Sequence, residues 1–107
     1  MRYYKNLYMS ENLADKKDKI IRKLNQNGIM WNTYVIALAQ GEQNHLEFFD
    51  SVLLQQKMIA GRDLFVVGIA SGYDEALVLV EEITKEVYDD TKGADIRSYI
   101  LNKDSGL

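Results

Sequence analysis

The clearest pattern of apolar and polar positions lies in residues 64–77, where an uninterrupted apolar run leads into a helical pattern. Residues 64–70 carry no charge, which is typical of a strand buried on both faces. A Ser71-Gly72 turn follows, and apolar residues then recur at helical spacing over residues 74–90, with Asp74 as the expected N-cap. This stretch predicts a buried strand followed by a helix.

Three further segments predict strands. Residues 33–39 form a second uncharged run. Residues 2–9 mix aromatic and polar side chains, which favours a strand at the edge of a sheet. Residues 95–101 are interpreted as a last strand, and residues 102–107 as a frayed tail.

Two more helices are expected. Residues 11–26 carry an apolar stripe on a lysine-rich helix, with Ser10 as its N-cap and Gly28 as its C-terminal cap. Residues 43–59 are interpreted as a helix because charged and amide residues interrupt any strand alternation. The alternative there is a strand through residues 48–54, which are rich in β-branched and aromatic side chains.

Shifting the chain by 31 residues lays residues 34–49 over residues 65–80 with several identities. This period fits one strand–helix unit, and any chain of alternating strands and helices would align with itself about as well. The expected fold is α/β: a single small domain over residues 1–107, in the order β-α-β-α-β-α-β. Its four-stranded sheet would be mainly parallel and packed by three helices, with the strand order left open.

Composition excludes several classes of site. The chain has no cysteine, which excludes disulfides, thiolate metal sites and cysteine nucleophiles. The first residues lack the apolar core of a signal peptide, and no apolar run reaches the length of a membrane span. We therefore expect a cytoplasmic protein with no membrane partner.

The charge is unevenly distributed. Residues 1–27 carry seven Lys and Arg against three Asp and Glu, whereas residues 28–107 carry six against thirteen. The excess of acidic residues over positions 28–107 argues against a nucleic-acid partner, because nucleic acid binds to a basic surface. The basic segment could bind an acidic face of a second copy, although a solvated helix rich in lysine also explains it.

Two glycine loops offer the best location for a ligand. In open parallel sheets, ligands bind beyond the carboxyl ends of the strands, and each loop follows a predicted strand. A glycine allows a tight turn, and the first N–H groups of the next helix can hold an anion. The candidate ligand-binding residues are Gly41, Glu42, Asn44, His45, Ser71, Gly72, Tyr73 and Asp74.

These loops carry little catalytic chemistry. Neither matches a nucleotide-binding pattern, and Glu42 and Asp74 would repel a phosphate. Ser71 has the position of a nucleophile elbow but not its glycine pattern, and its base would have to be His45, the sole histidine. The acidic residues near His45 do not converge as metal ligands. No catalytic residue, metal or cofactor is predicted, and the carboxylate pairs at 81–82 and 89–90 are interpreted as solvated.

The apolar surplus favours self-association. The expected helix at 43–59 is apolar over a wide face, and three helices would leave part of the sheet uncovered. Trp31 is expected to plug one end of the core, with an interface as the alternative. Four tyrosines are expected on strands near the uncovered part: Tyr3, Tyr4, Tyr8 and Tyr99.

The functional prediction is a non-enzymatic binding or protein-interaction protein that forms a homodimer. The alternative is a small enzyme or ligand-binding module with its site at loops 40–45 and 71–75.

Overall fold

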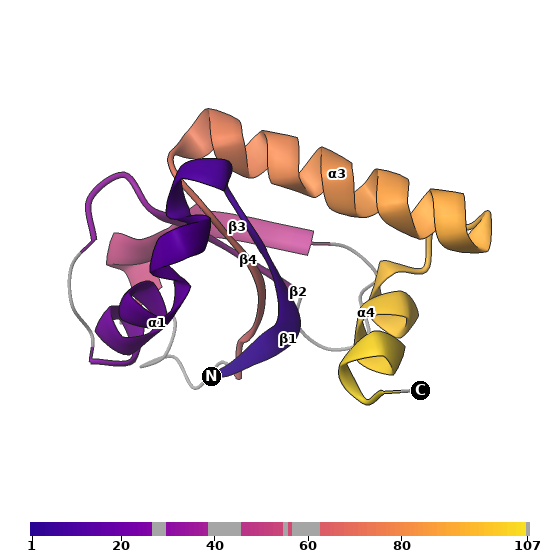
Figure 1. The fold of residues 1–107 in the computed structure, drawn as a ribbon, viewed down its shortest axis with the longest axis horizontal. Helices are drawn as coiled ribbons and strands as arrows, with labels where there is room; N and C mark the ends of the chain where they lie inside the picture. The colour runs from indigo at the N-terminus through magenta and orange to yellow at the C-terminus, as the bar shows by residue number, and fades with distance from the viewer. Residues whose placement is uncertain (27–29, 39–45, 55, 57–62, 107) are drawn as a thin grey trace.

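The computed structural model describes residues 1–26, 30–38, 46–54, 56 and 63–106, in which a four-stranded sheet lies between helices (Figure 1). Two short 3₁₀ helices, η1 and η2, accompany the α-helices. The elements are β1 (Arg2–Met9), η1 (Glu11–Lys16), α1 (Lys17–Asn25), β2 (Tyr34–Leu38), β3 (Leu46–Asp50), η2 (Ser51–Leu53), β4 (Phe65–Ala70), α3 (Tyr73–Thr91) and α4 (Ile96–Asp104).

The sheet is mixed, with strand order β1-β4-β2-β3. β1 pairs with β4 in parallel, whereas β2 is antiparallel to both of its neighbours, β3 and β4. The predicted α/β class and four strands are confirmed, but the mainly parallel sheet and the strict strand–helix alternation are wrong. An uncharged strand indicates burial on both faces, and a mixed sheet between two layers of helices buries its strands equally well.

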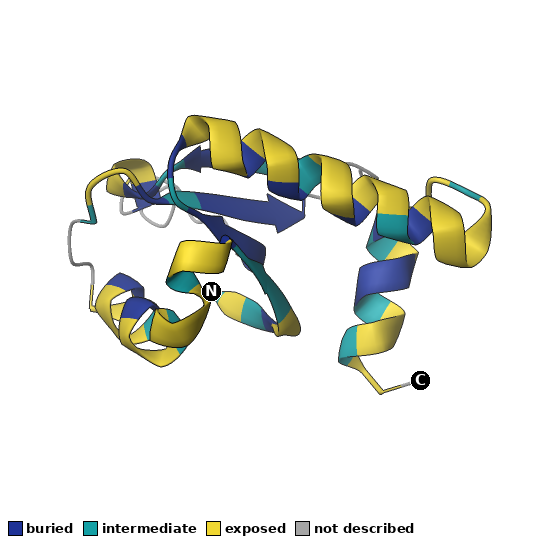
Figure 2. Ribbon diagram, turned by 45° about the horizontal axis from the view of Figure 1, so that its top comes forward, coloured by how far each residue is buried: buried dark blue, intermediate teal, exposed yellow. Residues whose placement is uncertain are grey.

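Apolar side chains form two clusters on opposite faces of the sheet. β4 contributes side chains to both clusters: Phe65 and Val67 belong to one, and Val66 and Ile69 to the other, together with Leu64, which precedes the strand. α3 and α4 complete the first cluster and α1 completes the second, so the described chain forms three layers. Figure 2 shows the buried strands between helices whose outer sides are exposed.

The expected strand at 64–70 and the expected helix at 74–90 are confirmed as β4 and α3. Asp74, however, is not the N-cap of α3. Gly72 occupies that position at φ 101°, and no side chain caps the helix there. Asp74 lies in the first turn instead, where a carboxylate interacts favourably with the helix dipole.

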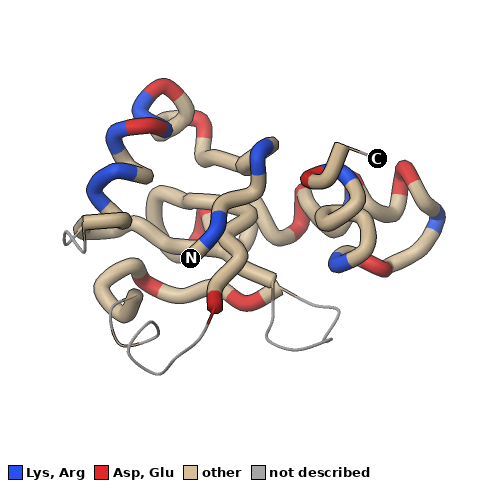
Figure 3. Tube along the Cα trace, turned by 90° about the horizontal axis from the view of Figure 1, so that it is seen from below, with Lys and Arg blue, Asp and Glu red and all other residues tan. Residues whose placement is uncertain are grey.

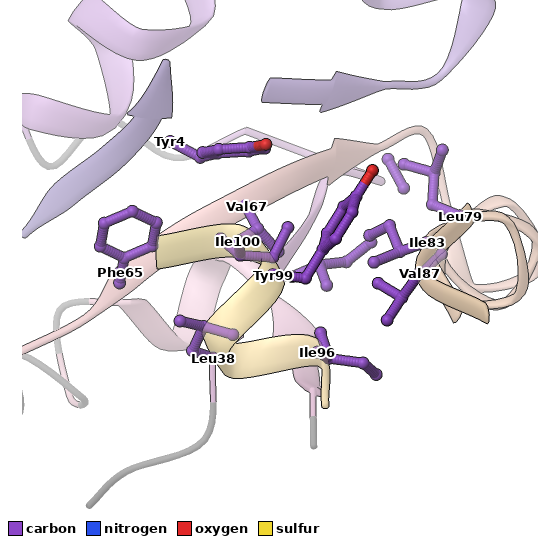
Figure 4. Packing of buried hydrophobic residues seen from close by; sticks show 13 residues of the cluster. Tyr4, Leu38, Phe65, Val67, Leu79, Ile83, Val87, Ile96, Tyr99 and Ile100 are labelled. Carbon is purple, nitrogen blue, oxygen red and sulfur yellow. The ribbon is translucent and has the colours of Figure 1, made fainter. Parts of the chain in front are cut away.

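The expected strand at 95–101 is wrong, because these residues form most of α4. Asp95 Oδ1 accepts a hydrogen bond from the Ser98 backbone N–H at 3.1 Å, which caps the helix. Ile96, Tyr99 and Ile100 then face the core together, as residues three and four apart do on a helix (Figure 4).

The expected frayed tail begins inside the same helix. Asp104, the last residue of α4, has its Oδ1 2.9 Å from the Lys5 backbone N–H, which donates to it. This bond joins the end of the described chain to the outer edge of β1.

The expected helix at 43–59 is also wrong over residues 46–53. β3 and η2 occupy that range, so the alternative strand at 48–54 was closer. Antiparallel pairing with β2 places Phe48 on the α3 side of the sheet and Phe49 on the α1 side. Asp50 then accepts a hydrogen bond from the Val52 N–H at 3.0 Å and begins η2.

The first 26 residues follow the prediction more closely. β1 is an edge strand of the sheet, as expected. The single helix expected at 11–26 is divided into η1 and α1, and the Ser10 side chain does not cap it. Gly28 lies outside the described residues.

The gap expected beside the tyrosines is filled by α4. Tyr99 lies on α4 rather than on a strand, and Tyr4 is buried in the same cluster (Figure 4). Trp31 is not in the core, because 82% of its surface is exposed. In the described part of the chain, no helix is both long and apolar enough to cross a membrane.

Candidate functional site

The two glycine loops do not follow parallel strands. Ala70, at the end of β4, pairs with Tyr34 at the start of β2, whereas Leu38 at the end of β2 pairs with Leu46. The residues that flank the first loop therefore lie at the opposite end of the sheet from the Ser71 turn. The reason given for joining the two loops in one site, a shared edge of a parallel sheet, is wrong. Gly41, Glu42, Asn44 and His45 themselves lie outside the described residues.

The Ser71 turn meets the end of β1 instead. The Ser71 backbone N–H donates to Ser10 Oγ at 3.0 Å, and Asn12 Nδ2 donates to Ser71 Oγ at 3.2 Å. The Ser10 N–H also donates to the Ile69 carbonyl at 3.1 Å. Ser10 and Asn12 had no role in the predicted site, because only the parallel pairing of β1 with β4 brings them there.

Gly72 makes the second contact of this turn, with the segment before β2. A Cβ on Gly72 would lie 3.2 Å from Asn32 Oδ1, and its φ of 101° is a conformation that glycine adopts without strain. Asn32 also has a positive φ, of 56°. The two turns therefore pack closely, and they bring the chain neighbours Trp31 and Tyr73 to the same end of the sheet.

Aromatic side chains gather at this end. The Tyr73 ring lies 5.5 Å from the Phe48 ring and 6.0 Å from the Tyr34 ring, between centroids, and 55% of Tyr73 is exposed. We call Trp31, Tyr34, Phe48 and Tyr73 the aromatic end of the molecule.

The backbone around Trp31 is anchored. Ser51 Oγ donates to the Met30 carbonyl at 2.9 Å, and the Ser51 N–H donates to the Thr33 carbonyl at 2.8 Å. Thr33 Oγ1 donates to the Trp31 carbonyl at 3.3 Å. The exposed indole is therefore carried by a turn that is tied to the end of β3.

The elements around the aromatic end carry exposed charges of both signs, and η1 itself carries Glu11 and Asp15 beside Lys16. η1 ends at the exposed Lys16 and leads into α1, along which lysines and arginines gather (Figure 3). Asp74 and Glu75 occupy the exposed first turn of α3. The Asn12–Ser71 hydrogen bond holds η1 beside the start of α3.

Of the predicted site residues, Ser71, Gly72, Tyr73 and Asp74 lie in the described part of the chain. Ser71 Oγ is engaged by the amide of Asn12, which is not a base. Within the described ranges, no group of three histidine or carboxylate side chains could hold a metal ion.

One cluster of titratable groups was missed by sequence reasoning. Tyr99 Oη donates to Asp90 Oδ2 at 2.5 Å and lies 3.0 Å from Glu86 Oε2, and the Tyr8 hydroxyl donates to that same glutamate oxygen. Burial, together with the hydrogen bonds to Asp90 and Glu86, raises the pKa of the Tyr99 phenol. Burial, with the hydrogen bond to Glu86, also raises the pKa of Tyr8.

This cluster is structural in character. Its phenols remain protonated at neutral pH, and they join β1 and α4 to the carboxylates of α3. Asp90, interpreted from the sequence as a solvated carboxylate, is an acceptor within this network. The i, i+4 spacing of Glu86 and Asp90 was visible in the sequence, but their tyrosine partners come from other elements.

A surface cavity of about 400 Å³ opens beside this cluster, between the end of α3 and α4. Lys103 lines it, and its Nζ lies 4.9 Å from the centre of the Tyr99 ring and 4.0 Å from Asp90 Oδ2. The lysine and the phenol in its wall therefore already have partners within the protein.

No protein family, curated protein or solved structure matches the chain in sequence or fold.

Proposed function

We propose that the chain is a non-enzymatic protein-interaction protein that self-associates through its aromatic end. The observation that carries the proposal is the 82% exposure of Trp31 on an anchored turn, at the same end of the sheet as the half-exposed Tyr73. Tryptophan and tyrosine dominate the binding energy of many protein interfaces. An exposed indole on a fixed backbone also loses little conformational freedom when it binds.

A second copy of this chain is the partner that the charges favour. A two-fold interface brings the same surface together twice, so it requires a self-complementary surface. α1 is basic, with exposed Lys19, Arg22 and Lys23, and the first turn of α3 is acidic, with Asp74 and Glu75, so the surface carries both signs of charge. In a two-fold dimer, the basic side of one copy can face the acidic side of the other.

The engagement of Ser71 supports a non-enzymatic role. A nucleophilic serine needs a base within hydrogen-bond reach, and the contact made by Ser71 Oγ is with an amide donor. In the ligand-binding alternative at residues 71–75, this hydroxyl can still donate to a ligand, because it only accepts from Asn12.

Sedimentation velocity over a wide concentration range tests the proposal. We expect a reversible dimer, and we expect the pair of changes Trp31→Ala and Tyr73→Ala to weaken dimerisation by about tenfold or more. Tyr88→Ala is the matched control, because Tyr88 is an equally exposed tyrosine near the other end of α3. A protein that stays monomeric at every concentration would refute self-association, and equal loss in the control would refute the assigned surface.

A further inference from the structure

α3 has an apolar stripe on its exposed side in addition to its buried one. The stripe consists of Leu77, Val80, Thr84 and Tyr88, spaced by three, four and four residues, so these side chains share one face of the helix over about 16 Å. Leu77 is 39% exposed and Tyr88 56% exposed, whereas Val80 is half-buried. The buried stripe of α3 consists of Ala76, Leu79, Ile83 and Val87, and Val80 packs against the same core cluster.

A helix that covers one sheet needs only one apolar stripe. The Thr84 hydroxyl is engaged, because Oγ1 donates to the Val80 carbonyl at 2.8 Å, whereas Tyr88 carries a phenol and has Lys92 Nζ 5.7 Å from the centre of its ring. The stripe therefore offers an apolar ridge to whatever packs on it.

The exposed residues beside the stripe are mainly acidic. Lys85 is the exception within the helix, and its Nζ lies 2.6 Å from Asp89 Oδ2 in an i, i+4 ion pair that raises the lysine pKa. The net charge of this face is negative. Its acidic residues are Asp74, Glu75, Glu81, Glu82 and Asp89.

We propose that the exposed stripe of α3 is the docking site for a basic amphipathic helix of a partner protein. An amphipathic helix places apolar anchors at spacings of three and four residues, which matches the ridge on α3. Basic residues along its flanks would lie opposite the acidic row. The α3 helix of a second copy would bring a second acidic row against the first, so self-pairing along this stripe is disfavoured. The stripe begins one helical turn after Tyr73 and shares its face of α3, but the proposal does not depend on self-association through the aromatic end.

A labelled synthetic helix tests the proposal by fluorescence anisotropy. The probe has leucine at positions three and four residues apart and lysine on its polar face. The control probe has glutamate in place of every lysine. We expect the lysine probe to bind, more weakly at higher salt because ions screen the exposed charges, and the glutamate probe not to bind. Failure of the lysine probe to bind would refute the proposal.

The decisive variant carries Leu77→Glu and Tyr88→Glu. These changes remove apolar anchors but make the face more acidic, so docking and simple electrostatic attraction predict opposite results. We expect binding of the lysine probe to weaken by about tenfold or more. Unchanged or tighter binding would show that only charge attracts the probe, and it would overturn the proposal. Both positions are exposed, and circular dichroism checks that the fold is kept.

Trp31→Ala is the matched control for the docking site. It should weaken self-association while leaving binding of the lysine probe unchanged, so the two proposals fail separately. Equal loss of probe binding in Trp31→Ala would overturn the assignment to α3. A change of oligomeric state in the Leu77→Glu, Tyr88→Glu variant would identify a second copy as the occupant, which also overturns it.

Discussion

Gly68 lies where three strands approach each other most closely. A Cβ there would be 3.3 Å from the Tyr8 carbonyl oxygen on β1 and 3.3 Å from Ile36 Cδ1 on β2. The pairing of β1 with β4 is interrupted after Tyr3 and resumes with Tyr8 opposite Gly68. The missing side chain is therefore what lets the interrupted edge strand return to the sheet.

We expect Gly68→Ala to lower the free energy of unfolding by about 1–3 kcal/mol, because a backbone carbonyl must move to admit the methyl group. Urea denaturation measures this. Gly93→Ala is the control, since its Cβ would meet only Thr91 Oγ1, at an ordinary 3.7 Å. The control should change stability by no more than about 1 kcal/mol. Equal losses in both variants would contradict the packing argument.

Single residues also show where sequence reasoning at the site succeeded. The glycine of the Ser71-Gly72 turn was expected for its conformational freedom, and its positive φ confirms this. The partners of the turn were not predictable. Ser10 and Asn32 are 61 and 40 positions away from their contacts in the sequence, and nothing local marks either residue as belonging to the same end of the sheet.

At the scale of elements, α4 depends on the residue that caps its N-terminus. Asp95 Oδ1 accepts the Ser98 N–H, which would otherwise lack an intrahelical partner. We expect Asp95→Ala to destabilise the protein by about 0.5–2 kcal/mol, and Asp95→Ser to retain most of the lost stability because serine also caps helices.

Hydrogen exchange of the α4 amides, together with urea denaturation, measures the effect of these Asp95 variants. If α4 stayed fully protected in Asp95→Ala, the capping role would be refuted. If Asp95→Ser lost as much stability as Asp95→Ala, a cause other than capping would be indicated.

Two short segments have the opposite secondary structure to the one predicted. Residues 46–50 form a strand where a helix was predicted, and residues 96–101 belong to a helix where a strand was predicted. Short apolar segments have nearly equal local preferences for strand and helix. Pairing with β2 decides the first case. In the second, the Asp95 cap was a sequence signal for a helix, and the hydrogen bonds of Tyr99 to α3 reinforce it.

At the scale of the whole molecule, tyrosine phenols with raised pKa values make the free energy of unfolding depend on pH in the alkaline range. Burial raises the pKa of Tyr3 to about 12, and it raises the pKa values of Tyr4, Tyr8 and Tyr99 as well. In the unfolded chain these phenols ionise near pH 10. The stability that they contribute is therefore fully present below about pH 10 and is lost as the pH rises from there toward their folded pKa values.

We expect the free energy of unfolding to fall as the pH rises above about 10, as the unfolded chain releases these protons first. Phenolate absorbance followed together with circular dichroism measures the effect. Tyr99→Phe removes one of the phenols and should make the decline shallower. If all tyrosines ionised at their ordinary pKa before the fold was lost, the linkage would be refuted.

The sequence by itself determined the α/β class, the buried strands at 34–38 and 65–70, the edge strand at the start of the chain, and the helix that follows β4. These features depend on local periodicity, and uncharged runs or helical spacing are visible without knowledge of contacts. Only the tertiary structure decided the direction of β2, and with it which turns share an end of the sheet. Hydrogen bonds between strands that are distant in sequence set that direction. It places the residues that flank one glycine loop at the opposite end of the sheet from the other loop, and it brings the turns that carry Trp31 and Tyr73 to one end, where both residues are exposed.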